Sequence, residues 1–304
     1  MPCSSRIVDS FRNYGEFVLL RIMITGANGH LGRRLIGVLG AKHEVVAAVR
    51  SERSAETLKG EPCEVCIVDY TDAEAIGQAA DGSDVLINLV GIIKQTKQNR
   101  YQDAHENPCQ AIAEAAQQCG IKRIISLSIF GADQNSTNAC LVSRARADDS
   151  LMAGDVPALI LRVPMVLGEG DYASRALLSN ARKKICFTFR ATSLEQPLYA
   201  GDLVRIVENL LVSDKAGVLE IGGDKSLPRR ELILKMANIL GTSPIVISLP
   251  IIIGRMMAWC LELLPSPPVT LDMINLLDHD DLIANADTDI ELTSLDDVLR
   301  KLAA

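Results

Sequence analysis

The sequence predicts an α/β protein built on a doubly wound parallel sheet, with a smaller lobe at its C-terminal end. A short apolar run, Ile22 to Ile24, ends at a Thr-Gly pair and is typical of a buried central strand. A helical pattern of leucine and isoleucine follows it over residues 31–39. Further short apolar runs then alternate with helical patterns, which is the order that a parallel sheet requires.

The turn between this strand and this helix contains three glycines. Gly26 permits a tight turn, Gly29 lets the backbone approach a phosphate because it has no Cβ, and Gly32 allows the helix to pack closely on the strand. The helix N-terminus adds unpaired N–H groups and a partial positive charge. We therefore predict a Rossmann-type sheet that binds a dinucleotide. The loop residues expected at the pyrophosphate are Gly26, Ala27, Asn28, Gly29, His30, Leu31, Gly32 and Arg33.

Length and composition fit one α/β domain and a lobe, since 48% of the 304 residues are hydrophobic. We assign 21–168 to the dinucleotide-binding domain and 169–304 to the lobe, with segments of about 200–222 returning to the core. Residues 1–20 carry mixed charge and are expected to be a disordered leader. The net charge of −7 argues against a nucleic-acid surface, which would show clustered Lys and Arg.

Cysteine usage bears on compartment and on metal binding. The eight cysteines are scattered and no secretory leader pattern is present, so we expect a reducing, cytoplasmic location. Cys63 and Cys66 have the spacing of a redox or zinc pair. However, they begin a predicted strand, where residues three apart face opposite sides, and no second Cys or His pair follows. We interpret them as two small strand residues and expect no metal site.

The second predicted strand, Glu44 to Arg50, ends where an enzyme that uses NAD keeps an acid for the ribose 2′-hydroxyl. The residue found there is Arg50, which can pair with a 2′-phosphate, as can Arg33 after the glycine turn. This pattern favours NADP (NADPH) as the cofactor. In the alternative, Arg50 faces solvent and Glu52 holds an NAD ribose.

The G-x-x-G-x-x-G spacing resembles that of the short-chain dehydrogenase/reductase (SDR) superfamily. In such proteins the Asp at the end of the third strand, here Asp69, lies beside the adenine, followed by Tyr70. The exit of the fourth strand, Asn88 to Gly91, passes under the cofactor ribose. The resemblance therefore adds to the expected cofactor contacts Asp69, Tyr70, Leu89, Val90 and Gly91.

Two later segments also resemble SDR patterns. The end of the strand that begins at Ala158 resembles an R-P-x-x-x-x-G signature, with Val163 inserted between Arg162 and Pro164. We expect Pro164 to contact the cofactor. Residues 196–202 resemble the Q-P-L-Y turn that returns the chain to the sheet, with Asp202 expected to cap the next helix.

The catalytic Tyr-x-x-x-Lys pair of ordinary SDR enzymes is absent from this sequence. In that pair, lysine lowers the tyrosine pKa so that the phenol can pass a proton while hydride moves. Aligning the helix after the fifth strand puts Cys140 at the tyrosine position and Arg144 at the lysine position. Arg144 can still hold the nicotinamide ribose but does not readily release a proton. Cys140 is expected to fill space on a packed helix, with a role as an acid as the alternative.

Other residues are candidates to replace the missing acid. The long polar stretch after the fourth strand, Ile92 to Glu106, lies where ligands bind in such folds, and it holds Lys94, Tyr101 and His105. The fifth strand carries Ser126 and Ser128 toward the nicotinamide region. The catalytic candidates are therefore Tyr101, His105 and Ser128, with Lys94 as a further possibility.

Together these motifs resemble an atypical SDR of the NmrA-like group and the relatives of the NADPH-binding accessory subunit of respiratory complex I; residues 292–299 also fit. That group often keeps the cofactor and loses the catalytic pair. We predict an NADPH-dependent oxidoreductase that acts on a small carbonyl or quinone substrate. The alternative is a non-catalytic structural, assembly or redox-sensing protein, peripheral on the inner face of a respiratory membrane.

The most apolar predicted helix follows Pro250 and runs from Ile251 to Leu264, before Pro265. At about 1.5 Å per residue it would span roughly 22 Å, less than the roughly 30 Å core of a bilayer. We expect no membrane span. We interpret the segment as a helix packed inside the lobe, with an interfacial or partner-binding face as the alternative.

Overall fold

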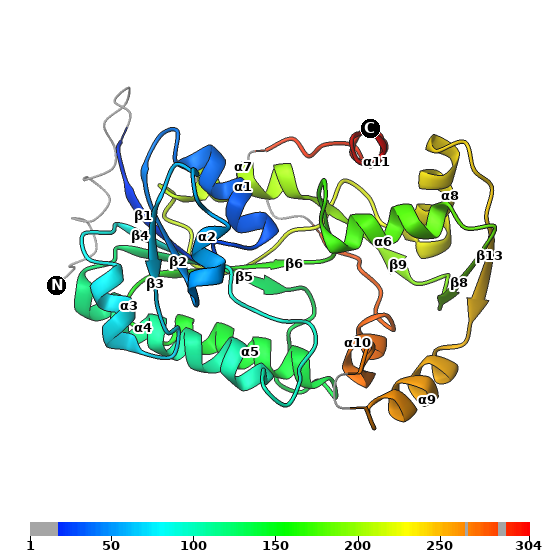
Figure 1. Ribbon diagram of the computed structural model, residues 1–304, viewed down its shortest axis with the longest axis horizontal. Helices are drawn as coiled ribbons and strands as arrows, with labels where there is room; N and C mark the ends of the chain where they lie inside the picture. The colour runs from blue at the N-terminus through cyan, green and yellow to red at the C-terminus, as the bar shows by residue number, and fades with distance from the viewer. Residues whose placement is uncertain (1–17, 265–266, 285–289) are drawn as a thin grey trace.

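The computed structural model of the protein describes residues 18–264, 267–284 and 290–304. Seven parallel strands form its central sheet, in the order β11-β6-β5-β4-β1-β2-β3 (Figure 1). The prediction of a doubly wound α/β fold is confirmed. The strands are β1 (Arg21–Thr25), β2 (Glu44–Val49), β3 (Glu64–Ile67), β4 (Val85–Asn88), β5 (Arg123–Ile129), β6 (Ala158–Val163) and β11 (Gly217–Glu220).

Helices cover both faces of the sheet because its central strands are apolar on both sides. In β1, Ile22 and Ile24 face one core cluster, whereas Met23 faces the other. The first cluster includes side chains of α1 (His30–Leu39) and α7 (Ala200–Leu210). The second includes side chains of α3 (Ala73–Ala79), α4 (Asn107–Cys119) and α5 (Ala139–Met152).

Strand order reverses between β1 and β4, which are neighbours in the sheet but lie far apart in the chain. At such a reversal the connections leave toward opposite faces and open a crevice at the carboxyl ends of the strands. The glycine turn after β1 and the exit of β4 therefore lie side by side. A short α2 (Glu52–Glu56) follows β2, and a π-helical turn, η2 (Gln102–Glu106), precedes α4.

The C-terminal lobe has a third core cluster of its own. It is built around α6 (Tyr172–Ala181), α8 (Arg229–Ile239) and α11 (Leu295–Ala303), with a parallel two-stranded ribbon of β8 (Ile185–Phe189) and β13 (Ile245–Leu249). Figure 1 shows the ribbon at the end of the molecule remote from β1–β3, with α9 (Ile251–Leu261) at one end of it and α10 (Leu271–Leu276) next to α9. Short pairs join the parts: β7 (Val166–Leu167) with β10 (Leu198–Tyr199), and β9 (Leu194–Glu195) with β12 (Leu227–Pro228).

Several expectations need comment. The expected leader falls mostly on residues 1–17, which lie outside the described residues, whereas Leu20 is buried. In the described part of the chain, no helix is long and apolar enough to cross a bilayer, and no cluster of metal-binding side chains occurs. The expectation of a lobe-packed helix after Pro250 is wrong, because only Gly254 and Ala258 of α9 are buried.

Candidate functional site

The glycine turn brings the backbones of β1, β4 and α1 close together. Gly26 has a φ of +70°, and a Cβ added there would lie 3.1 Å from the backbone carbon of Leu89. A Cβ on Gly32 would lie 2.4 Å from the carbonyl oxygen of Ala27, so only glycine fits. Gly29 is exposed at the start of α1, and this helix has neither a side-chain cap nor an acid in its first turn. The first turn thus fits an anion such as a pyrophosphate.

A buried polar network fixes the exit of β4 beneath this turn. Thr25 donates from Oγ1 to Oδ1 of Asn88 at 2.8 Å, and the Val90 amide donates to the same oxygen at 3.2 Å. The Asn88 side-chain amide donates to Ser126 at 3.1 Å. Ser126, expected near the nicotinamide, therefore serves to hold the strand ends together.

Tyr70 supports the glycine turn from below. Its hydroxyl accepts a hydrogen bond from the Gly26 amide at 2.9 Å and donates to the Ala48 carbonyl at 2.6 Å. The ring is buried, and burial raises the pKa of Tyr70 to about 12. Asp69 is exposed, and hydrogen bonds from Thr71 lower the pKa of its carboxyl. Direct contact of either residue with the adenine stays a prediction.

Arg50, directly after β2, and Arg33, in the first turn of α1, are the side chains expected near a 2′-phosphate. Arg50 is exposed and Arg33 half-buried, and within the described residues neither makes an ion pair. Sequence reasoning missed Ser54, whose hydroxyl lies 3.3 Å from the side-chain nitrogen of Asn28 in the glycine turn. Ser51 caps α2 by accepting from the Ser54 amide, and an N-cap serine directly after a strand is the signal that would have found this pair.

The side chain of Arg144 crosses from α5 to the ends of β4 and β5. Nη1 donates to the carbonyl oxygens of Val90 at 3.1 Å and Leu127 at 3.4 Å. A Cβ added to Gly91 would lie 1.6 Å from Nη2, so the guanidinium fills the space that glycine leaves open. Burial lowers the pKa of Arg144, and nearby Cys140, Cys109 and Asp148 oppose that shift.

Tyr101, His105 and Cys140 gather next to this arginine. The rings of Tyr101 and His105 stack with centroids 5.4 Å apart, and Tyr101 donates from its hydroxyl to the Ile93 carbonyl at 2.9 Å. Burial raises the pKa of Tyr101 above its usual value, with the adjacent Cys140 and Asp272 adding to the effect. Burial also raises the pKa of Cys140 to about 11, so its thiol is neutral.

His105 is buried and its ring lies against the main chain. Nε2 is 3.1 Å from the Ile92 amide, and Nδ1 has no hydrogen-bond partner among the described residues. Burial, reinforced by the positive charge of Arg144, lowers the pKa of His105 to about 3. The imidazole is therefore neutral at ordinary pH. The π-helical turn that contains His105 is a feature frequent at functional sites.

The structure does not gather every predicted candidate. Ser128 donates to the Asp148 carboxylate at 3.0 Å, and Arg162 donates to the same oxygen at 3.0 Å, so the serine proton is already engaged. Lys94 donates to the carbonyl of Pro267 in the C-terminal lobe. Asp272, on α10, lies beside Tyr101 and Cys140 and was missed. Because Asp272 lies far from Tyr101 and Cys140 in the sequence, no local pattern predicts this contact.

Pro164 is half-buried just after β6. Cys63 and Cys66, interpreted as two small strand residues, are both half-buried, and burial raises the pKa of each thiol. Asp202 does not cap α7 but lies in its first turn, where its carboxylate accepts from the amide and hydroxyl of Thr293, each at 2.7 Å.

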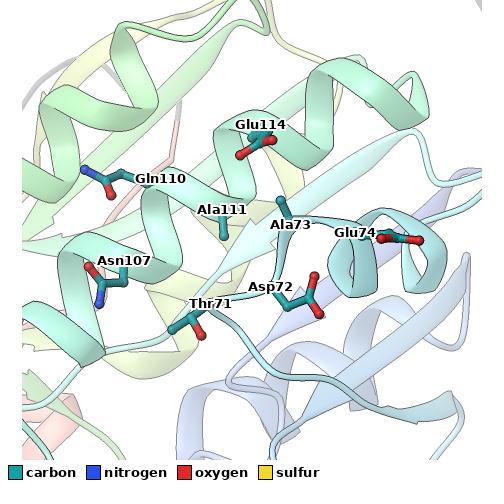
Figure 2. A pocket seen from close by; sticks show the side chains of 8 residues that line it. All are labelled: Thr71, Asp72, Ala73, Glu74, Asn107, Gln110, Ala111 and Glu114. Atoms are coloured by element: carbon teal, nitrogen blue, oxygen red, sulfur yellow. The ribbon is translucent and has the colours of Figure 1, made fainter.

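Two surface cavities flank the candidate cofactor crevice. One of about 590 Å³ lies between the start of α3 and α4, and Figure 2 shows Thr71 and Asp72 on one side of it and Asn107 on the other. The other, about 350 Å³, lies between η2 and α5, with Tyr101 in its wall. The first adjoins Asp69 and Tyr70, where we expect the adenine.

Comparison with known proteins gives a consistent picture. Residues 26–184 match the model of the NAD(P)H-binding family. The chain is 26% identical to the ceramide reductase of Caulobacter vibrioides over 75% of this chain and 73% of that protein. It is 28% identical to NADH dehydrogenase [ubiquinone] 1 alpha subcomplex subunit 9 of Arabidopsis thaliana over 92% of this chain and 74% of that one.

Solved structures support the fold. UDP-N-acetylglucosamine 4-epimerase from Bacillus cereus superposes with a TM-score of 0.70 at 15% identity, over 93% of this chain and 98% of that one. WbmG from Bordetella bronchiseptica, solved in complex with NAD, superposes with a TM-score of 0.66 at 19% identity, over 78% and 84% of the two chains.

Proposed function

Because the chain belongs to the NAD(P)H-binding family, as an atypical SDR protein that binds a nicotinamide cofactor, we propose that it is an NADPH-dependent reductase of a carbonyl or quinone. One observation carries the proposal. The phenol of Tyr101 lies beside Cys140, the residue at the SDR tyrosine position, and Arg144 at the lysine position packs against Gly91. A tyrosine from the segment after β4 therefore lies close to the position where ordinary SDR enzymes have their catalytic tyrosine and where α5 has Cys140.

The residues of the crevice suit the parts of NADPH. The first turn of α1 would hold the pyrophosphate, and Arg33 with Arg50 would pair with the 2′-phosphate. Arg144 has donors beyond those used on Val90 and Leu127, and these would bond the nicotinamide ribose. When bound, the cofactor supplies a hydride. NAD is the alternative, with Glu52 at the ribose.

A carbonyl that accepts a hydride at carbon leaves the electron pair on oxygen, which then needs a proton. Tyr101 is the candidate donor, because its phenol lies beside Cys140 at the SDR tyrosine position. Its raised pKa keeps the phenol protonated but makes it a weaker acid than the lysine-assisted tyrosine of ordinary SDR enzymes. To act, its hydroxyl must exchange the Ile93 carbonyl for the substrate oxygen. Neutral His105, stacked on the ring, would orient the phenol rather than donate a proton.

The second candidate function is cofactor binding without turnover, in a structural, assembly or redox-sensing role. It is favoured by the hydrogen bonds that hold the side chains of His105 and Tyr101 to main-chain atoms of residues 92 and 93. The Arabidopsis relative is named as a subunit of NADH dehydrogenase, which agrees with this alternative. Our expectation of a small-molecule substrate and of a cytoplasmic location stays a prediction.

The two candidates separate in a screen for NADPH oxidation. The panel should contain small ketones, quinones and keto-lipids, the last because the Caulobacter relative is named a ceramide reductase. For a reductase, Tyr101→Phe should lower kcat by about 100-fold or more and leave the Kd for NADPH unchanged. Cys140→Ala serves as the neighbouring control. Tight NADPH binding with no oxidation of any compound would reject turnover and favour the second function.

A further inference from the structure

The helix α9 exposes a wide apolar face, unlike an ordinary surface helix. Its charged residues bond back to the protein: half-buried Arg255 donates to Asn275 at 2.9 Å and to Asp278 at 3.0 Å, and Glu262, exposed at the C-cap, accepts from the Leu271 amide at 2.8 Å. The small residues Gly254 and Ala258 also lie inward. Apart from Glu262, the exposed side chains of residues 251–264 are all apolar or cysteine: Ile252, Ile253, Met256, Met257, Trp259, Cys260, Leu263 and Leu264.

This apolar face continues onto the ribbon of β8 and β13. Phe187 pairs with Ile247, and the neighbouring Ile185 pairs with Ile245, on the side of the ribbon away from its core. Phe189 lies on the same side of β8, since alternate residues share a face, and its ring is 3.1 Å from a Cβ built on Gly254 of α9. The exposed apolar side chains of ribbon and helix therefore adjoin and form one surface. Figure 1 places β8, β13 and α9 at the outer end of the lobe.

Charge around this surface indicates what covers it. Arg182, Lys183 and Lys184 are all exposed and lead directly into β8, so the cations and α9 stand at opposite ends of the ribbon. The elements β8, β13 and α9 contain no acid, although the chain as a whole has a net charge of −7. The exposed acid Glu262 stands at the C-cap of α9, beyond the end of the ribbon remote from the cations. Anionic headgroups of a bilayer would supply the counter-charge that these cations lack within β8, β13 and α9.

We propose that this surface, formed by β8, β13 and α9 with Arg182–Lys184 at its edge, docks on an anionic phospholipid bilayer. The helix lies in the plane of the interface with its apolar side among the acyl chains, and it does not cross. Trp259, 67% exposed, has the side chain most typical of the headgroup level. This inference does not rest on the proposed reductase activity.

Trp259 is the only tryptophan in the chain, so its fluorescence reports on this surface alone. Phosphatidylcholine vesicles containing phosphatidylglycerol should shift its emission to shorter wavelength, and brominated lipids should quench it. Pure phosphatidylcholine should give a much smaller effect. Replacing Lys183 and Lys184 with alanine should weaken partitioning about fivefold for each charge removed.

The matched pair of variants is Met256→Glu on this surface and Met152→Glu at the end of α5, both replacing an exposed methionine. Met256→Glu should lower vesicle partitioning by roughly tenfold, because the face loses buried apolar area and gains a charge. Met152→Glu should leave it unchanged. Circular dichroism confirms that each variant folds.

Three results would overturn the proposal. Trp259 emission that ignores vesicles of both compositions excludes a lipid surface. A dimer in solution that Met256→Glu dissociates, without vesicle binding, assigns the face to a second copy. Vesicle binding that is equal for the Met256 and Met152 variants shows that charge alone, and not this surface, drives it.

Discussion

Replacing Arg144 with alanine should weaken NADPH binding and leave binding of adenosine 2′-phosphate, the other half of the cofactor, unchanged. The guanidinium has five donors, and two contacts to the carbonyls of Val90 and Leu127 hold it in place over Gly91. Losing a hydrogen bond from a charged donor costs about 1.5–3 kcal/mol, which corresponds to roughly 10- to 150-fold in Kd. Fluorescence titration with both ligands measures the two affinities.

A substitution at Gly91, which contacts Arg144, should cause the same loss of NADPH affinity. Gly91→Ala places a Cβ 1.6 Å from Nη2 of Arg144 and must expel the guanidinium. It should reproduce the Arg144→Ala defect, and the double variant should be no worse than either single one, since both remove one interaction. Gly77→Ala is the control, because an added Cβ there meets open space.

Two outcomes would refute this reasoning. Unchanged NADPH affinity in Arg144→Ala would mean that the arginine does not face the ribose, and that the alignment of α5 with the SDR helix is mistaken. Equal weakening of adenosine 2′-phosphate would show that the whole crevice has collapsed. Cys140→Ala should change the affinity for NADPH little, because its neutral, buried thiol only fills space in this account.

Three further predictions concern the turn, the cofactor preference and pH. Tyr70→Phe should lower the free energy of unfolding by about 1–2 kcal/mol in denaturant titrations, since its hydroxyl makes two hydrogen bonds beneath the glycine turn. Arg50→Ala should weaken NADPH about tenfold and leave NADH unaffected; equal losses for both would contradict a role at the 2′-phosphate. In the folded protein the pKa of His105 is lowered to about 3, whereas in the unfolded chain it is about 6.5, so protonation favours the unfolded chain. The stability that neutral His105 contributes is therefore complete above about pH 6.5 and is lost as the pH falls toward 3. His105→Gln should flatten this part of the stability curve relative to the parent, and an unchanged slope would show that His105 is not its source.

Much of the fold was predictable because its signals are local. The apolar strands, the glycine turn and the helix pattern of 31–39 each lie within a few residues, and together they define the sheet. The ribbon was not predicted: residues 182–184 leave α6, which ends at Ala181, and lead into β8. The two strands pair with each other across about sixty residues, so their partner cannot be inferred from either segment alone.

The residues of the candidate site also fall into two groups, those that local sequence patterns predict and those that they do not. The turn residues and the position of Arg144 follow from patterns inside single segments, whereas Asp202 and Asp272 depend on contacts across the chain. Asp202 has the sequence context of a helix cap, but Thr293 competes for its carboxylate with both an amide and a hydroxyl. Asp272 reaches Tyr101 only because the C-terminal lobe folds back over the crevice.

The apolar helix after Pro250 shows why burial cannot be inferred from composition. An apolar helix with two charges is expected to bury its apolar side and expose the charges. Here Asn275 and Asp278 bond to Arg255 from α10 and the residues just after it, which holds this half-buried arginine on the side of α9 that faces them. Glu262 accepts from the Leu271 amide and stays exposed. Gly254 and Ala258 occupy the buried positions of α9, so its large apolar side chains face outward. The direction of the apolar face is therefore set by polar partners up to about twenty residues downstream, and only the structure reveals them.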